Sequence, residues 1–494
     1  VAARVTYLHI FDANQQLLMS ETNHIEQVRI TAKRGSIVDK NGVVLAESVL
    51  KEDVATASPS AWVRNYPLGP SGSIVLGYMS EVTSDELGCL EGLCYGPGML
   101  TGRSGIEKAQ ERRLRGNDGG LIQEIDARGN VVRERGRNES EDGTTVKLTL
   151  DSRLQSIAYR AMDAARVEDK SVKGAVVVMS MQGEILALVS YPTYDPAEVP
   201  KYLSDTTENY FLNRATTGQY PPGSVFKMVT AYAGLASDKI ESDTEIADTG
   251  EIKIGEYRYG TWNFDQAGRK EGNLSLTRAL SRSNDIYFYR VGELVGVTDL
   301  VKMARKFGLG STTGIEIGGE AEGLVPDPLW KERRTGESWF LGNTYHLSIG
   351  QGDLLTTPLQ VARMSVASVT GRVCRSKIVA ESEAECIDLD IPTPDIEAVK
   401  AGMRAACATG GTAYPFFSFE PYVLCKTGTA QHAGQIPSAS SGPKGDDVLP
   451  HAWITVAYPG ENPELVITVL VESGGEGSAV AGPIAKQILD EWKL

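Results

Sequence analysis

Residues 221–227, with the sequence PPGSVFK, decide how this 494-residue chain can be interpreted. Two prolines and a glycine end an extended segment, and the apolar residues that follow predict a helix beginning at the serine. Ser224 and Lys227 are three residues apart, so their side chains lie on one helical face. A desolvated lysine can take the proton of a serine hydroxyl, and the N–H groups of a helix start can bind an oxyanion.

This serine–lysine spacing is a weak signal by itself, because it occurs twice more, at Ser48–Lys51 and Ser441–Lys444. The first pair follows a predicted hairpin. The second lies in a Gly/Ser/Pro-rich stretch, residues 432–450, which predicts a mobile loop between two strands. Neither pair has a helix start to organise it, so a solvated surface explains both.

The segment KTGT, residues 426–429, follows apolar residues and predicts a strand. Lys426 supplies a cation, Thr427 and Thr429 supply hydroxyls, and Gly428 lets a substrate backbone approach closely. Such a strand can bind an extended peptide by strand addition and hold its terminal carboxylate. An ordinary edge strand with a protective lysine is the alternative for this segment taken alone.

A third element is the tripeptide Ser283-Asn284-Asp285. A second serine and an acid could relay protons to a nucleophile and orient a peptide carbonyl. Taken alone, the tripeptide cannot be distinguished from a helix cap. Together and in this order, however, the three elements match the motif set of penicillin-binding proteins and serine β-lactamases.

The rest of the chain predicts two domains. In residues 1–145 we expect a hairpin at Asn41-Gly42, a Gly-rich charged segment and a helix over 106–114. Residues 146–494 open with a helix capped by Asp151 and close with another helix. Four strands are predicted beside these helices, over residues 175–181, 184–191, 453–457 and 465–472.

Hairpin-linked strands imply an antiparallel sheet, and the helices at both ends of this region imply that its faces are covered. We therefore expect the terminal elements of residues 146–494 to meet in one α/β (α+β) unit. Residues 1–145 are expected to form an extended, β-rich pedestal.

Charge and cysteine content exclude other classes. The net charge of −15 argues against nucleic-acid binding, which needs a basic surface. The six cysteines and five scattered histidines lack zinc-site spacing and predict buried thiols, or one or two local disulfides. Cys89–Cys94 and Cys374–Cys386 are the candidates for local bridges, whereas Cys407 and Cys425 lie in more apolar surroundings.

Over nearly its whole length the sequence resembles class B (monofunctional) penicillin-binding proteins. The segments that carry the resemblance, besides the three motifs, are RGSIVD (34–39) with Asn41-Gly42, GRSGIEK (102–108) with LRG (114–116), SIGQG (348–352), TPLQ (357–360), GTA (411–413) and EGSAVA (476–481). The resemblance implies a pedestal of the dimerisation type, a transpeptidase domain, and no metal or cofactor.

By this resemblance Ser224 is the nucleophile that forms an acyl-enzyme, and Lys227 is its general base. Ser283 and Asp285 form the second motif, and Asn284 between them is expected to bind substrate. The strand that recognises the substrate carries Lys426, Thr427, Gly428 and Thr429. The backbone N–H groups of Ser224 and Thr429 would form the oxyanion hole.

The implied activity is that of a peptidoglycan D,D-transpeptidase, which cross-links stem peptides ending in D-Ala-D-Ala and is inhibited by β-lactam antibiotics. A D,D-carboxypeptidase or β-lactamase-like hydrolase, and a non-catalytic β-lactam sensor or scaffold, are the alternatives. Asp285, where many relatives have Asn, favours the elongation type. The stretch before Gly102 lacks the long insertion of the larger elongation-type pedestals.

The family also implies a membrane setting. Its members are anchored by one N-terminal membrane helix, and their catalytic domain lies outside the cytoplasm beside a membrane glycosyltransferase partner. This chain has no apolar stretch of that length and begins with Val, so we expect that the anchor is absent from it.

Overall fold

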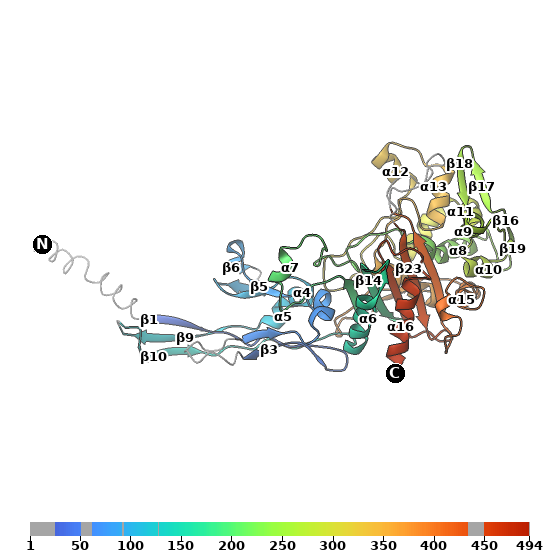
Figure 1. Ribbon diagram of the computed structural model, residues 1–494. Coiled ribbons are helices and arrows are strands. Elements are labelled where there is room, and N and C mark those ends of the chain that lie inside the picture. The colour runs from blue at the N-terminus through green and yellow to red at the C-terminus, as the bar shows by residue number, and fades with distance from the viewer. Residues whose placement is uncertain (1–24, 51–61, 91–92, 127, 433–448, 494) are drawn as a thin grey trace, which may run out of the picture.

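The computed structural model describes residues 25–50, 62–90, 93–126, 128–432 and 449–493. Within these ranges the N-terminal part forms a slender, β-rich arm, and the remainder forms a thicker body of sheet and helices (Figure 1). The expected fold class, a β-rich pedestal joined to a helix-covered α/β unit, is confirmed. In the described part of the chain, no helix combines the length and the apolar character needed to cross a lipid bilayer.

Two sheets run along the arm. The antiparallel sheet at its far end has the strand order β1 (Ile25–Ile30), β9 (Gly119–Ile125), β10 (Val131–Asn138). The second sheet has the order β11 (Val146–Lys147), β2 (Ile37–Val38), β3 (Val44–Leu50), β4 (Trp62–Asn65). The expected hairpin at Asn41-Gly42 joins β2 to β3, and Gly42 has the positive φ of 86° that this turn requires.

Short elements complete the arm. They are the helices α3 (Ser73–Leu76), α4 (Gly105–Ala109) and α5 (Glu111–Arg115), the 3₁₀ turns Gly69–Gly72 and Ser84–Glu86, and the strands β5 (Met79–Glu81), β6 (Gly88–Leu90), β7 (Leu93–Tyr95) and β8 (Leu100–Gly102). The helix expected over 106–114 is therefore two helices. It breaks because Gln110 adopts φ −112° and ψ 24°, which lie outside the helical region.

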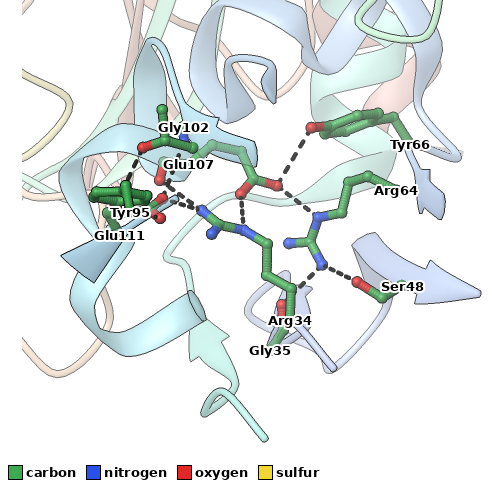
Figure 2. A network of polar contacts seen from close by, with 10 residues as sticks. Arg34, Gly35, Ser48, Arg64, Tyr66, Tyr95, Gly102, Glu107 and Glu111 are labelled. Atoms are coloured by element: carbon green, nitrogen blue, oxygen red, sulfur yellow. Dashed lines mark hydrogen bonds and ion pairs between the residues drawn. The ribbon is translucent and has the colours of Figure 1, made fainter. Parts of the chain in front are cut away.

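A buried ionic network holds these pieces of the arm together (Figure 2). Arg34 donates to Glu107 at 2.6 Å and to Glu111 at 2.7 Å, and Arg64 donates to the second oxygen of Glu107 at 2.7 Å. The Glu107 side chain is fully buried. A buried charge is tolerated only when it is paired in this way, so the network fixes β4 and the segment before β2 against α4 and α5.

The body is built on one antiparallel sheet of five strands. Its order is β15 (Ile185–Tyr191), β14 (Gly174–Ser180), β24 (Leu465–Val471), β23 (His451–Tyr458), β22 (Leu424–Ala430). The four predicted strands are confirmed to within two residues at each end. β14 pairs with β24 along its whole length, from Gly174 opposite Val471 to Ser180 opposite Leu465, so the terminal elements meet as expected.

Both faces of this sheet are buried, and alternate residues of each strand serve different faces. Val176 and Val178 contribute to one apolar cluster, which α6 (Ser152–Ala164) and α16 (Ala481–Lys493) cover. Val177 and Met179 contribute to the larger cluster on the opposite face. The helix α6 begins as expected, because the Asp151 carboxylate accepts hydrogen bonds from the first free N–H groups.

The larger cluster packs beneath a helical layer. Its helices are α8 (Lys227–Ala236), α10 (Leu276–Arg282), α11 (Asp285–Lys306), α13 (Leu341–Ser348), α14 (Pro358–Thr370) and α15 (Thr393–Ala406). The remaining elements are β12 (Arg166–Val167), β13 (Lys170–Ser171), α7 (Pro200–Leu203), β16 (Ile246–Asp248), β17 (Glu251–Ile254), β18 (Tyr257–Gly260), α9 (Trp262–Ala267), β19 (Gly272–Leu274), α12 (Pro328–Thr335), β20 (Arg372–Cys374), β21 (Cys386–Asp388) and the 3₁₀ turn Tyr414–Phe416. Most of the loop expected over 432–450 falls outside the described residues.

All six cysteines are paired, as Cys89–Cys94, Cys374–Cys386 and Cys407–Cys425. The first two bridges are the local candidates, and each links neighbouring strands. The expectation of buried thiols, or at most two bridges, is therefore wrong. The third pair was not predicted, because its apolar surroundings suggested buried thiols. Cys407 follows α15 and Cys425 lies in β22, and the two are brought together because these elements pack against each other.

Candidate active site

Ser224 lies in a tight 3₁₀ turn, Gly223–Phe226, that leads directly into α8. The α-helix thus begins at Lys227, one turn later than the expected start at the serine. Gly223 adopts φ +56°, and its N–H donates to the Gly350 carbonyl at 2.8 Å. A Cβ atom at position 223 would lie 2.8 Å from the Thr429 carbonyl oxygen, so glycine allows this turn to approach β22.

Lys227 is completely buried and points toward the second motif. Its ammonium group donates to the Asp285 carboxylate at 2.7 Å, to the Ser283 carbonyl at 2.7 Å and to the Ser283 hydroxyl at 3.3 Å. Burial lowers the pKa of Lys227, and the Asp285 carboxylate opposes that shift.

Lys426 reaches the same serine from the other side. It is completely buried in β22, and its ammonium group donates to the Ser283 hydroxyl at 2.9 Å and to the Thr427 carbonyl at 2.9 Å. Burial, together with the charge of Lys227, holds the pKa of Lys426 well below its usual range. The Ser283 hydroxyl therefore lies between two lysines whose ammonium forms are both disfavoured.

The second motif both caps a helix and supplies the two side chains that contact the buried lysines. Ser283 ends α10 with a left-handed φ of +53°, and Asn284 caps α11 by accepting a hydrogen bond from the Tyr287 N–H. This sharp turn places Ser283 and Asp285 beside the lysines. Asn284, predicted to bind substrate, is buried and its side-chain oxygen serves the cap.

The KTG segment lies on β22, which is an edge strand of the sheet. Gly428 lies opposite Trp453 of β23, and the indole of Trp453 donates to the Pro221 carbonyl at 3.0 Å. The Thr427 hydroxyl donates to that of Thr412 at 2.8 Å. The edge expected for peptide addition is therefore present, next to the turn that carries Ser224.

These residues open into one cleft of about 630 Å³. The predicted residues among those that line it are Ser224, Ser283, Asp285, Thr427, Gly428 and Thr429. Lys227 and Lys426 are fully buried and reach the cleft through Ser283. Three motifs far apart in the sequence thus converge, as the family resemblance implies. Within the described residues, no three His, Cys, Asp or Glu side chains gather as a metal ion would require.

Part of the cleft was not predicted. Its second wall comes from the β17–β18 hairpin and α9, where Arg258 pairs with Glu251 and Asp265. This hairpin carries no distinctive motif, so no sequence pattern predicted its place in the cleft. Thr412, Gln351 and Glu476 also line the cleft, and they belong to segments on which the family resemblance rests.

Comparison with known proteins agrees with this geometry. Residues 174–490 match the model of the penicillin binding protein transpeptidase domain, and residues 56–148 match that of the penicillin-binding protein dimerisation domain. The chain belongs to the penicillin-binding protein family. Because a dimerisation domain precedes the transpeptidase domain, this penicillin-binding protein is of class B.

Relatives resemble the chain along most of its length. It is 31% identical to peptidoglycan D,D-transpeptidase MrdA of Escherichia coli over 87% of this chain and 71% of that protein. The structure of penicillin-binding protein 2 (PBP2) from Helicobacter pylori in complex with MreC is similar, with a TM-score of 0.80, 27% identity, and 95% and 99% coverage of the two chains. A structure described as a peptidoglycan synthase complex that coordinates polymerization and crosslinking also matches, with a TM-score of 0.80, 27% identity, and 99% and 95% coverage.

Proposed function

We propose that this protein is a peptidoglycan D,D-transpeptidase that cross-links stem peptides through an acyl-enzyme on Ser224. The observation that carries this proposal is the Ser283 hydroxyl held between two buried lysines, in the cleft that Ser224 and the edge strand β22 line. The relatives named D,D-transpeptidase support the same activity.

In the first half-reaction the Ser224 oxygen attacks the carbonyl carbon of the penultimate D-Ala. Its proton passes to the neutral amine of Lys227, whose lowered pKa makes that form accessible. The C–N bond to the terminal D-Ala breaks, and the leaving nitrogen takes a proton, relayed by Ser283. The backbone N–H groups of Ser224 and Thr429 stabilise the oxyanion, a role that fits the close approach of Gly223 to Thr429.

Donor binding follows from the edge position of β22. The stem peptide extends the sheet beside Gly428, and its terminal carboxylate is bound by the hydroxyls of Thr427 and Thr429. Burial disfavours the ammonium form of Lys426 in the free protein, and the bound carboxylate favours it, because an opposite charge nearby raises the pKa of an amine. Lys426 is then the cation that balances this carboxylate, although the chain as a whole has a net charge of −15. The site therefore attracts its anionic end group against the overall charge of the protein.

In the second half-reaction an amine of a neighbouring stem attacks the acyl-enzyme. A hydrolase would instead activate water at this step, and a β-lactamase needs a positioned base to do so. The carboxylates that line the cleft in the described residues are Asp265, Asp285 and Glu476, of which the first two are paired with Arg258 and Lys227. The ion pairs hold Asp265 and Asp285, so neither of these two carboxylates is free to activate water.

We further propose that the chain divides near residue 145 into a pedestal and a transpeptidase domain, a division that the two family matches support. The three disulfides support a location outside the cytoplasm, because disulfides persist in oxidising compartments. The similarity to MrdA, to PBP2 and to a peptidoglycan synthase complex supports an elongation-type role beside a membrane glycosyltransferase.

Labelling with a fluorescent penicillin tests the proposed function. We expect stable labelling of the wild type and a loss of at least about 10³-fold in Ser224→Ala, because the nucleophile is gone. Chromogenic cephalosporin turnover, measured in parallel, should be slow. Rapid turnover would reassign the protein to the β-lactamases. A wild type that is folded yet unlabelled would identify a non-catalytic protein.

A further inference from the structure

Glu476 is a cleft carboxylate that the proposed mechanism leaves without a role. It lines the cleft that Ser224 also lines, and its side chain is exposed to solvent there. One of its oxygens accepts a hydrogen bond from the Gln266 amide at 3.4 Å. Because this amide is neutral, it does not balance the negative charge of the carboxylate. In the described part of the cleft, Asp265 and Asp285 both have cationic partners, and Glu476 has none.

The backbone fixes this carboxylate beside the substrate strand. At Gly477, the next residue, an added Cβ atom would lie 2.4 Å from the Gly428 carbonyl oxygen and 2.1 Å from that of Trp453. The Gly477 N–H also points to the Thr429 hydroxyl, 3.5 Å away. Glycine therefore allows the loop after β24 to pack directly on β22 and β23. This packing fixes the backbone from which the Glu476 side chain extends into the cleft.

The chemistry of the second half-reaction calls for such a group. A primary amine with the usual pKa near 10 enters the cleft at neutral pH almost entirely as an ammonium ion. An unpaired carboxylate attracts that cation, whereas it repels the carboxylate of the donor peptide. The charge of Glu476 thus suits the acceptor and not the donor.

We propose that Glu476 is the residue that recognises the ammonium group of the acceptor amine, an inference that rests on the proposed transpeptidase function. Once bound, the ammonium loses one proton to the neutral Lys227 amine. The nitrogen lone pair then forms a C–N bond with the acyl carbon, and the C–O bond breaks with its electron pair on the Ser224 oxygen. That oxygen takes the second proton from nitrogen. Glu476 binds the cation and exchanges no proton.

Two acceptors of different charge test this role. Glycinamide is largely cationic at neutral pH and hydroxylamine is neutral, and both can be supplied with the same D-Ala-D-Ala donor peptide. For Glu476→Gln we expect the KM for glycinamide to rise about two- to fivefold, as for an exposed ion pair, with little change in kcat. The KM for hydroxylamine should stay constant, and the glycinamide effect should shrink at high salt.

Matched variants complete the experiment. Glu461→Gln removes the same charge from an exposed position outside the cleft and should leave both KM values unchanged. Glu476→Asp should restore part of the glycinamide affinity. Equal changes for both acceptors, or no change for either in a penicillin-reactive variant, would overturn the role of Glu476 alone. A wild type that penicillin does not acylate would overturn the proposed function as well.

Discussion

At the scale of the residue, the site depends on the pKa of Lys227, which burial lowers and the Asp285 carboxylate raises. Burial favours the neutral amine that can accept the Ser224 proton, and the Asp285 carboxylate, 2.7 Å away, favours the ammonium form. An asparagine at this position would still accept a hydrogen bond but would add no charge. Asp285 therefore sets the pH at which the base becomes available.

The first residue-scale prediction concerns Asp285→Asn. Losing the carboxylate removes the influence that raises the pKa of Lys227, so that pKa falls further. Acylation needs the neutral amine, so the rising limb of its pH–rate profile should move to lower pH. The second-order rate constant of penicillin acylation is measured from about pH 5 to about pH 10, a range that covers the titration of a lysine with a lowered pKa.

The control is Asp265→Asn, which removes the same charge from the cleft without a contact to Lys227 and should leave the rising limb in place. An unmoved limb in Asp285→Asn would contradict this view of the base.

At the scale of the element, β22 must keep Lys426 and the Thr residues in register with the Ser224 turn. One side of the strand pairs with β23, and the other is the open edge for substrate. The bridge between Cys425 and Cys407 ties the strand to the end of α15, one residue from Lys426. A strand at the edge of a sheet has backbone hydrogen bonds to a neighbouring strand on one side only. The disulfide therefore adds a second attachment that holds Lys426 in position.

Replacing both Cys407 and Cys425 with Ala should therefore affect stability and activity together. The bridge closes a loop of 18 residues, for which chain entropy gives a loss of about 3 kcal/mol. We expect a lower Tm and slower penicillin acylation, measured by thermal unfolding and stopped-flow labelling. The paired replacement of Cys89 and Cys94, in the arm, should leave the acylation rate unchanged. If the Cys407/Cys425 variant acylated at the wild-type rate, the bridge would have no part in positioning β22.

At the scale of the whole molecule, the arm combines apolar packing with a buried ionic network. The larger apolar cluster extends from the body into the arm through Leu45, Leu76 and Ile106, and the arm adds the network around Glu107 (Figure 2). Ionic networks of this kind fail when one member is removed, because the remaining charges stay buried without partners.

Glu107→Ala should accordingly destabilise the arm by about 3–5 kcal/mol, since it leaves Arg64 without its ionic partner in a buried site and Arg34 with Glu111 alone. Glu139→Ala breaks an exposed pair with Arg137 in the same arm and should cost less than about 1 kcal/mol. Limited proteolysis and unfolding measurements compare the two variants. If both lost the same stability, the network would not be what holds the arm together.

The sequence predicted the motifs well because their chemistry is local. Ser224 and Lys227 lie in neighbouring turns of one segment, Lys426 lies on a predicted strand, and Asp151 caps α6, the helix that directly follows it. Cys407–Cys425 could not be predicted in this way, because it depends on how α15 packs against β22. The same holds for Glu476, which lies in the cleft because the neighbouring Gly477 packs against Gly428 and Trp453.

The pairing of β14 with β24 has a consequence for how the protein is made. Strands that are neighbours in the centre of the sheet lie near opposite ends of the body in the chain, at residues 174–180 and 465–471. The sheet cannot close until β24 has been synthesised, and contacts so distant in sequence form slowly. During that interval β14 and β15 expose their apolar faces and their free edges. The cell must therefore shield a long, unfinished chain before the cleft that carries Ser224 exists.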